Sequence, residues 1–437
     1  MTGREPSYID GLDPAIFSFI QYEDYADRYP TLTAQGFPAS FYEELRFASA
    51  RLFRIFVKAA LVFQQAPDDF ARDMDMPEAL LPYLRTANFF GLPTWLSRFD
   101  FVLDEGGHIR MVELNADTPC FLIESYYANG VAADWFGRRD PNAGAMEALR
   151  HFLRKVYDGL CASVVDLGAR DFCRRPFVFS CFDDCPEDLA TTRFLQRLMA
   201  ESCPQGDIRF LSFYDMEIDA AGIPLKDGAH AAALYRLHPI EILIDERTAD
   251  GEPLGQMFLD LYQEGCFALF NPPEAVILQN KSFMALVYAL YRTNRFFTAE
   301  ERDIIRRYLV PSYFEADYEA LSDGEYVYKE IWGREGRNVC VLRKRGANHE
   351  MVIEKLVDRY DEIVCRESGK AMYQTFIRQK RFHHRVDSGE KEGFLTFSCF
   401  MLFGQPSALG CRFSPEAIAG TEAYFLPLVE EGANGAR

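Results

Sequence analysis

The sequence lacks the motifs of several common enzyme classes. It contains seven histidines without an HExxH segment, and eleven cysteines scattered without a CxxC pair. This pattern argues against a zinc site and against a disulfide framework, and reduced thiols indicate a cytoplasmic protein. No GxGxxG follows a predicted strand, and no GxxxxGK[ST] or GxSxG segment is present. Dinucleotide binding of the Rossmann type, P-loop chemistry and serine hydrolysis are therefore not supported.

Positive charge and long apolar runs are also scarce. The chain has 47 Lys and Arg against 66 Asp and Glu, a net charge of −19, which disfavours nucleic acid or an anionic membrane as the main partner. The same charge is compatible with a cationic substrate such as a polyamine. No apolar stretch could span a bilayer, and the first residues lack the apolar core of a signal peptide. The basic run Arg378–Arg385 is short, so a solvated loop or a phosphate-facing rim is favoured over a nucleic-acid contact.

The composition is that of a globular enzyme with several substructures. The chain has 437 residues and is 49% apolar, which predicts two or three units around a large shared core. We expect an N-terminal region over 1–170, a central α/β layer over 171–270 and a third unit over 271–437. In the central layer, strands Phe177–Phe182 and Ile208–Phe213 flank a helical segment, which predicts a βαβ unit.

A helix is predicted early in the chain. Ser40 and Glu43 form the S-x-x-E pattern of a capping box. An apolar stripe at helical spacing follows, which includes Leu45, Leu52 and Phe63. This helix is expected to pack beneath the hairpin described next.

Two short strands within residues 97–125 carry the most informative polar pattern. Arg98 and Asp100 are two residues apart on the first strand, as are Glu113 and Asn115 on the second. Alternate residues of a strand share a face, so each pair points one way. Their register depends on the turn between the strands.

The turn predicts how these side chains are paired. If Asp104–Gly107 is a four-residue hairpin loop, Arg98 lies opposite Glu113, and the four polar side chains share one face. Two carboxylates, an amide oxygen and a guanidinium on one face can hold Mg²⁺ and a phosphate. They can equally form a structural ion pair between Arg98 and Glu113, and spacing alone leaves both interpretations open.

A glycine loop later in the chain also has two interpretations. Residues 332–337 separate two predicted strands, and Gly333 and Gly336 lie within this loop. It is either a plain hairpin turn or a flap whose N–H groups cover phosphates, with Lys329 neutralising charge. Lys281, at a predicted helix start, is by position alone a solvated surface charge.

Eight segments in order along the chain resemble the synthetase portion of the glutathionylspermidine synthase family, a group of ATP-grasp C–N ligases. They are RFDF (Arg98–Phe101), ELNADTPC (Glu113–Cys120), FDDCPEDL (Phe182–Leu189), LYRLHPIE (Leu234–Glu241), QNK (Gln279–Lys281), YKEIWGREGRNV (Tyr328–Val339), MYQ (Met372–Gln374) and GCR (Gly410–Arg412). The resemblance implies a mixed α/β ATP-grasp fold, with a pre-ATP-grasp region before the nucleotide-binding region. The stretch before residue 98 is too short for the amidase domain of bifunctional members.

The resemblance also implies roles for individual residues on the nucleotide side. The matched positions are the Mg²⁺ ligands Asp100, Glu113 and Asn115, the phosphate contact Arg98, the ATP-phosphate lysines Lys281 and Lys329, the flap residues Glu335 and Gly336, the adenine-segment residue Gln374, and Arg412 at the developing acyl phosphate. With Lys281, Lys329 and Arg412 supplying a phosphate site, Arg98 is interpreted as a phosphate contact, which leaves Glu113 free for the metal.

On the substrate side, the resemblance implies that Thr118 and Cys120 line the acid-substrate pocket. Glu187 and Asp188 match paired acids suited to a peptide ammonium or a polyamine. The implied reaction joins a small-molecule or peptide acid to an amine through an acyl phosphate, with ATP and Mg²⁺. A homodimer is compatible with the sequence.

The chain departs from the family pattern in three places. Glu330 follows the strand lysine where proline is common, Thr118-Pro119-Cys120 replaces a serine pattern, and Phe-Ser-Pro follows Arg412 without the usual acid. These departures leave an alternative of a different class, a nucleotide-binding regulatory or partner protein that retains the ATP cradle without ligation. A third alternative is an enzyme that releases the phosphorylated acid.

Overall fold

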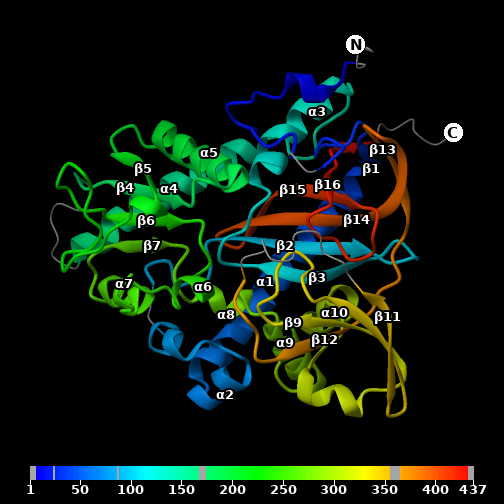
Figure 1. Ribbon diagram of the computed structural model, residues 1–437. Coiled ribbons are helices and arrows are strands. Elements are labelled where there is room, and N and C mark those ends of the chain that lie inside the picture. The colour runs from blue at the N-terminus through cyan, green and yellow to red at the C-terminus, as the bar shows by residue number, and fades with distance from the viewer. Residues whose placement is uncertain (1–5, 23–24, 86–87, 167–173, 355–364, 432–437) are drawn as a thin grey trace.

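The computed structural model describes residues 6–22, 25–85, 88–166, 174–354 and 365–431 (Figure 1). These residues form a six-stranded sheet, a five-stranded sheet, a four-stranded sheet and a two-stranded pair. In Figure 1 the four-stranded sheet lies to the left of the six-stranded sheet, and the five-stranded sheet lies below it. The site residues predicted from sequence gather where these three layers meet.

The six-stranded sheet is antiparallel and joins distant parts of the chain. Its order is β16-β15-β14-β2-β3, and β13 pairs with the outer part of β14. The bounds are β2 Leu96–Leu103, β3 Ile109–Asn115, β13 Phe382–Val386, β14 Gly389–Leu402, β15 Gln405–Ser414 and β16 Tyr424–Phe425. The second half of the basic run Arg378–Arg385 is therefore strand, not the loop expected from sequence.

Helix α1, Ala39–Gln65, packs against this sheet through its apolar stripe. Leu45, Leu52 and Phe63 are buried, as predicted, and the ring of Phe56 meets that of Phe99 edge-on at 5.7 Å. The predicted capping box is wrong. The helix begins one residue earlier, with Pro38 at the N-cap and no side-chain cap, so Ser40 lies inside the first turn.

The four-stranded sheet is parallel, with order β5-β4-β6-β7. Its strands are β4 Phe177–Cys181, β5 Ile208–Ser212, β6 Ala233–Arg236 and β7 Ala268–Phe270, and the helices beside it are α4 Ala145–Asp166 and α5 Pro186–Ser202. The predicted βαβ unit is confirmed. Trp95 stacks on Phe270 at 6.0 Å and connects this layer to the six-stranded sheet.

The five-stranded sheet is antiparallel, with order β11-β10-β9-β12-β8. Its strands are β8 Ser312–Phe314, β9 Gly324–Glu330, β10 Cys340–Arg345, β11 Asn348–Glu354 and β12 Ala371–Thr375, preceded by helices α9 Ser282–Arg292 and α10 Ala299–Tyr308. Tyr326 packs with Tyr318 and Tyr373 on one face of this sheet. Alternation along β9 therefore directs Glu325 and Lys329 to the other face.

The remaining elements are short. They are the parallel pair β1 Gln35–Phe37 and β17 Leu428–Glu430, the helices α2 Asp68–Asp73, α3 Asn129–Trp135, α6 Ile240–Leu243, α7 Leu254–Gln263 and α8 Ala275–Gln279, the 3₁₀ turns Tyr8–Gly11, Glu78–Tyr83, Phe213–Asp215 and Glu315–Ala320, and a π-helical turn Glu124–Ala128. Within the described ranges, no helix combines the length and apolarity needed to cross a membrane. The expected boundary at residue 170 falls in 167–173, outside the described residues.

The observed register of β2 and β3 differs from the predicted one but keeps the predicted face. Leu103 pairs with Ile109, so the loop has five residues instead of four, and a bulge next to Asp100 adds another residue. Arg98 therefore lies opposite Asn115, and Asp100 opposite Glu113. The total displacement is two residues, and an even displacement leaves each side chain on its original face.

Candidate active site

Asp100 is the centre of a buried hydrogen-bond network. Arg98 donates from Nε and Nη2 to its two carboxylate oxygens, both at 2.8 Å. Ser398 Oγ donates at 2.7 Å, Asn115 Nδ2 at 3.1 Å and Arg412 Nη2 at 3.0 Å. The two oxygens of Asp100 thus accept five hydrogen bonds, and they bring together residues from β2, β3, β14 and β15.

Glu113 is paired with a lysine, which the sequence analysis did not predict. Lys281 Nζ lies 2.9 Å from Glu113 Oε1. Burial opposes ionisation of this carboxyl, but Lys281 and Lys329 outweigh burial and lower the pKa of Glu113 to about 2. Among the described residues, Arg98 forms its ion pair with Asp100. The alternative ion pair between Arg98 and Glu113, which the spacing had left open, is not formed in the described chain.

Lys329 faces the same space from the five-stranded sheet. Its Nζ donates to Gln374 Oε1 at 2.9 Å and to the carbonyl of Val112 at 3.3 Å. Val112 is the extra residue of the bulge, so the bulge presents a carbonyl to this lysine. Burial lowers the pKa of Lys329 to about 8, although Glu113 opposes this shift. An anion beside Lys329 would stabilise its charged form.

The glycine loop between β9 and β10 is attached at its base and contacts Lys281. Trp332 donates its indole N–H to the carbonyl of Asp75 at 2.8 Å, and its backbone N–H to Ser368 Oγ at 2.8 Å. Lys281 Nζ donates to the Gly333 carbonyl at 2.6 Å. Glu335 and Gly336 have φ values of 52° and 77°, left-handed conformations that allow a sharp reversal at the loop tip.

The loop that follows β3 is fixed by contacts that sequence reasoning did not assign. Arg236, on β6, donates to both oxygens of Asp117, at 2.6 and 2.8 Å, and both side chains are fully buried. Gln279 Oε1 accepts the N–H groups of Ala116 and Asp117 at 2.8 and 3.2 Å. Asp117, Arg236 and Gln279 all lie within the quoted family segments, which was the available signal for them. They position Thr118 and Cys120.

Thr118 and Cys120 lie where this loop meets Arg98. Arg98 Nη1 donates to the Cys120 carbonyl at 2.6 Å. Burial raises the pKa of the Cys120 thiol well above its usual value, and Asp188 and Glu187 raise it further. The thiol is therefore not activated as a nucleophile.

Carboxyl groups gather beside this loop. Glu187 and Asp188 occupy the first turn of α5. Burial, followed by the neighbouring Glu187, raises the pKa of Asp188 to about 7. Burial and Glu335 raise the pKa of Glu187, whose Oε2 accepts a hydrogen bond from Tyr22 at 3.0 Å. The structure therefore brings Glu335, of the loop 332–337, close to both predicted substrate acids.

Two charged residues near these acids were missed. Arg334, next to Glu335 in the loop 332–337, has its pKa held above the usual value by Glu241, although burial opposes this. Glu124 is 1% exposed, and burial together with Glu187 raises its pKa. Glu124 lies in the apolar run CFLIES of the sequence, where a lone acid among buried residues was the only signal.

Asp100, Glu113 and Asn115 fit Mg²⁺ by donor chemistry. They supply two carboxylates and an amide oxygen, and Asp100 and Glu113 lie directly opposite each other on paired strands. In the described part of the chain, no group of three or more His, Cys, Asp or Glu residues is placed to hold a metal. The predicted site has only two such residues, so its remaining ligands must be Asn115, water or phosphate oxygens.

A pocket of about 550 Å³ lies beside Glu325, at the start of β9, whereas Lys329 lies near the end of that strand. Glu325 is on the same face of β9 as Lys329, and it pairs with Arg343 at 2.9 Å and Arg378 at 3.3 Å. Phe376 and Phe394 add aromatic surface to this space. It is large enough for part of a nucleotide and carries both apolar and charged groups.

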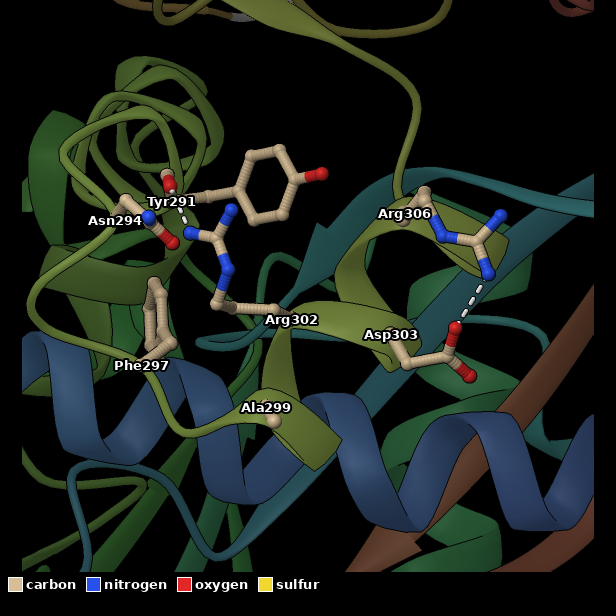
Figure 2. A pocket seen from close by; sticks show the side chains of 7 residues that line it. All are labelled: Tyr291, Asn294, Phe297, Ala299, Arg302, Asp303 and Arg306. Atoms are coloured by element: carbon tan, nitrogen blue, oxygen red, sulfur yellow. Dashed lines mark hydrogen bonds and ion pairs between the residues drawn. The ribbon is translucent and has the colours of Figure 1, made fainter.

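A second pocket, of about 490 Å³, lies between α9 and α10 (Figure 2). Arg302 lies over the ring of Tyr291 at 4.5 Å, and Arg306 forms an ion pair with Asp303. Both arginines already have partners, and none of the predicted site residues lines this pocket. We assign no role to it.

The sequence matches the family described as "Glutathionylspermidine synthase preATP-grasp" over residues 15–430. The chain belongs to the glutathionylspermidine synthase family. This match confirms the resemblance stated from the eight segments and supports a synthetase-type ligase in general. The predicted site residues that the structure brings together lie within the matched range.

A solved structure agrees at the level of the fold. A glutathione synthetase-like effector from Globodera pallida, in its apo form, has a TM-score of 0.56 and 10% sequence identity with this chain. The alignment covers 97% of this chain and 96% of that one. At this identity the likeness shows the fold alone, and it confirms the mixed α/β ATP-grasp-like architecture.

Proposed function

We propose that this protein is an ATP-dependent ligase that joins a carboxylic acid to an amine through an acyl phosphate. The observation that carries the proposal is the meeting of Arg98, Lys281, Lys329 and Arg412 around two facing carboxylates. Four cations with an acidic pair suit a phosphoryl group and a bound metal better than a structural core, because each buried charge costs free energy on folding.

The ATP phosphates are assigned to the space between Lys281 and Lys329, beneath the loop 332–337. Lys281 already reaches the Gly333 carbonyl of this loop, so phosphate binding and loop closure involve the same ammonium group. A closed loop excludes water, which would otherwise hydrolyse an acyl phosphate. The nucleoside end is assigned to the 550 Å³ space near Glu325, with Gln374 between the two ends.

Mg²⁺ is assigned to Asp100, Glu113 and Asn115, where it would neutralise charge on the transferring phosphoryl group. Asp100 must then release hydrogen bonds that it now accepts. Arg412 is the candidate to move, because 27% of its side chain is exposed against 7% for Arg98. Released from Asp100, Arg412 can donate two hydrogen bonds to the acyl phosphate oxygens.

The acid substrate is assigned to the loop carrying Thr118 and Cys120, and the amine to the carboxyl groups on α5. The carboxylate of the acid attacks the terminal phosphorus of ATP, and ADP leaves. The amine nitrogen then attacks the acyl carbon, and phosphate leaves. A peptide or amino acid and a polyamine are the substrates that the acidic surroundings and the family favour.

The proposal is tested by supplying ATP and Mg²⁺ with glutathione and spermidine, and then with a panel of other peptide acids and amines. We expect ADP release to require one acid and one amine together, and mass spectrometry to find their condensation product. A product equal in mass to the phosphorylated acid would indicate the third alternative. A thermal shift with Mg-ATP without turnover across the panel would instead favour a nucleotide-binding regulatory protein.

A further inference from the structure

Glu124 is a buried carboxyl group that the reaction outlined above does not use. It begins the π-helical turn Glu124–Ala128, a rare conformation that is frequent at functional sites. Its Oε1 accepts a hydrogen bond from Tyr29 at 3.0 Å. Its Oε2 is buried and has no hydrogen-bond partner among the described residues. A buried carboxyl oxygen without a partner is costly, and a bound donor would remove this cost.

Glu187 forms a pair with Glu124. The ring of Tyr22, which binds Glu187, lies 5.8 Å from that of Tyr29, which binds Glu124. In addition to the effect of burial, Glu187 raises the pKa of Glu124. Both carboxyls also raise the pKa of each of the two tyrosines. Glu124 is buried and Glu187 is partly buried, so their negative charges repel each other and a further cation beside them would stabilise both.

The charged groups around the pair come from four further positions. Arg412 on β15 lowers the pKa of both carboxyls, and Arg98 on β2 lowers that of Glu187. Glu335 in the flap acts in the opposite direction, and Asp188 follows Glu187 on α5. Arg412 also contacts Asp100 and lies over the Phe121 ring at 5.3 Å. The carboxyl pair therefore borders the arginine assigned to the acyl phosphate.

We propose that Glu124 and Glu187 bind the ammonium group of the amine substrate, and that Glu124 accepts its proton. This inference rests on the proposed ligase function. The ammonium N–H bond breaks and the proton moves to Oε2 of Glu124. The freed nitrogen lone pair forms the C–N bond, while the bond between the acyl carbon and the phosphate oxygen breaks. Phosphate leaves with those electrons and takes the second excess N–H proton, which leaves a neutral amide.

The test follows carboxyl titration by NMR on the full chain labelled with ¹³C at Glu Cδ. The Glu124 resonance is assigned by its loss in Glu124→Gln. We expect a midpoint well above the ordinary value of about 4.3, and a lower midpoint when propylamine is added. Tetramethylammonium, which has no N–H group, should not cause this change. Tyr29→Phe should raise the midpoint in the free protein, because the tyrosine hydrogen bond stabilises the carboxylate.

Glu274 is the matched control. It is also buried, burial raises its pKa to about 7, and its Oε2 has no partner among the described side chains. It lies against Asn88, which donates to its Oε1 at 3.1 Å, and neither Glu124 nor Glu187 contributes to the shift of its pKa. Its midpoint should not respond to propylamine. An ordinary midpoint for Glu124, or equal responses of Glu124 and Glu274 to propylamine, would overturn the inference.

Failure of this inference is distinguishable from failure of the proposed function. Stabilisation of the wild-type protein by Mg-ATP tests the nucleotide site and does not involve Glu124. In the active enzyme, Glu124→Gln should keep the Mg-ATP thermal shift and reduce amide formation by about 10²-fold or more. If the amine response of Glu124 is absent while wild-type ligation proceeds, only the proton-accepting role is wrong.

Discussion

Replacing Arg236 with Met should be strongly destabilising. The guanidinium makes two hydrogen bonds to Asp117, at 2.6 and 2.8 Å, and neither side chain is exposed to solvent. After the substitution, the buried carboxylate keeps only the Ile240 N–H at 3.0 Å. An unpaired buried charge of this kind costs about 3–5 kcal/mol in the free energy of unfolding. The loop carrying Thr118 should also lose its position.

Urea unfolding of Arg236→Met, followed by fluorescence, measures this cost. Arg209→Met is the matched control, since Arg209 lies on strand β5 of the same sheet and pairs with Asp207 and Asp227 at 35% side-chain exposure. Exposed pairs contribute about 0–1 kcal/mol, so the control should lose little stability. The double variant Arg236→Met with Asp117→Leu should recover part of the loss. If Arg236→Met loses no more than the control, the reasoning about the buried pair is refuted.

Three further predictions concern the site. Lys329→Met should abolish the thermal shift caused by Mg-ATP. The control is Lys344→Met, which should keep the shift, because Lys344 is a buried lysine of the neighbouring strand β10 and donates to the Gly346 carbonyl of its own turn. The pKa of Asp188 is about 7 when folded and near 3.8 when unfolded, so its contribution to stability should fall as pH rises from about 4 to about 7, by at most about 4 kcal/mol. In melting curves across that range, Asp188→Asn should remove this contribution, while the other carboxyls with raised pKa values keep theirs. Trp332→Phe removes the hydrogen bond to the Asp75 carbonyl, at a stability cost of about 1 kcal/mol. With the loop less firmly attached, ATP hydrolysis without amide formation should increase. A ratio of ADP to amide equal to the wild-type ratio would contradict the role of the loop as a flap.

Sequence patterns predicted the strands and the shared polar face of the hairpin better than its pairing. Period-2 alternation placed Asp100 and Glu113 on one face, and the face survived because the register changed by two residues. The pairing of Arg98 with Asn115 depended on a five-residue loop and on the bulge at Val112. The bulge has no local sequence signal, because the carbonyl of Val112 accepts its hydrogen bonds from Lys329 and Gln374 of another sheet.

The long-range partners of the site residues could not be predicted from sequence. Glu113 was expected to be free for a metal, but Lys281, far along the chain, pairs with it. The contact of Asp117 with Arg236 also joins two sheets, although both residues stood in recognisable segments. Such pairs depend on tertiary packing, whereas the βαβ unit depends on local periodicity, and that unit was predicted correctly. The roles assigned to the site residues stay predictions until they are tested.

The most direct test of the proposed ligation measures ADP formation with ATP and Mg²⁺, with and without an acid and an amine. We expect ADP only when both are present, and loss of turnover after EDTA or in Asp100→Asn, by about 10²-fold or more. Asp104→Asn is the control, because Asp104 lies at the hairpin tip and binds His108 and Arg110. ADP formation independent of acid and amine, or full activity in Asp100→Asn, would contradict the account.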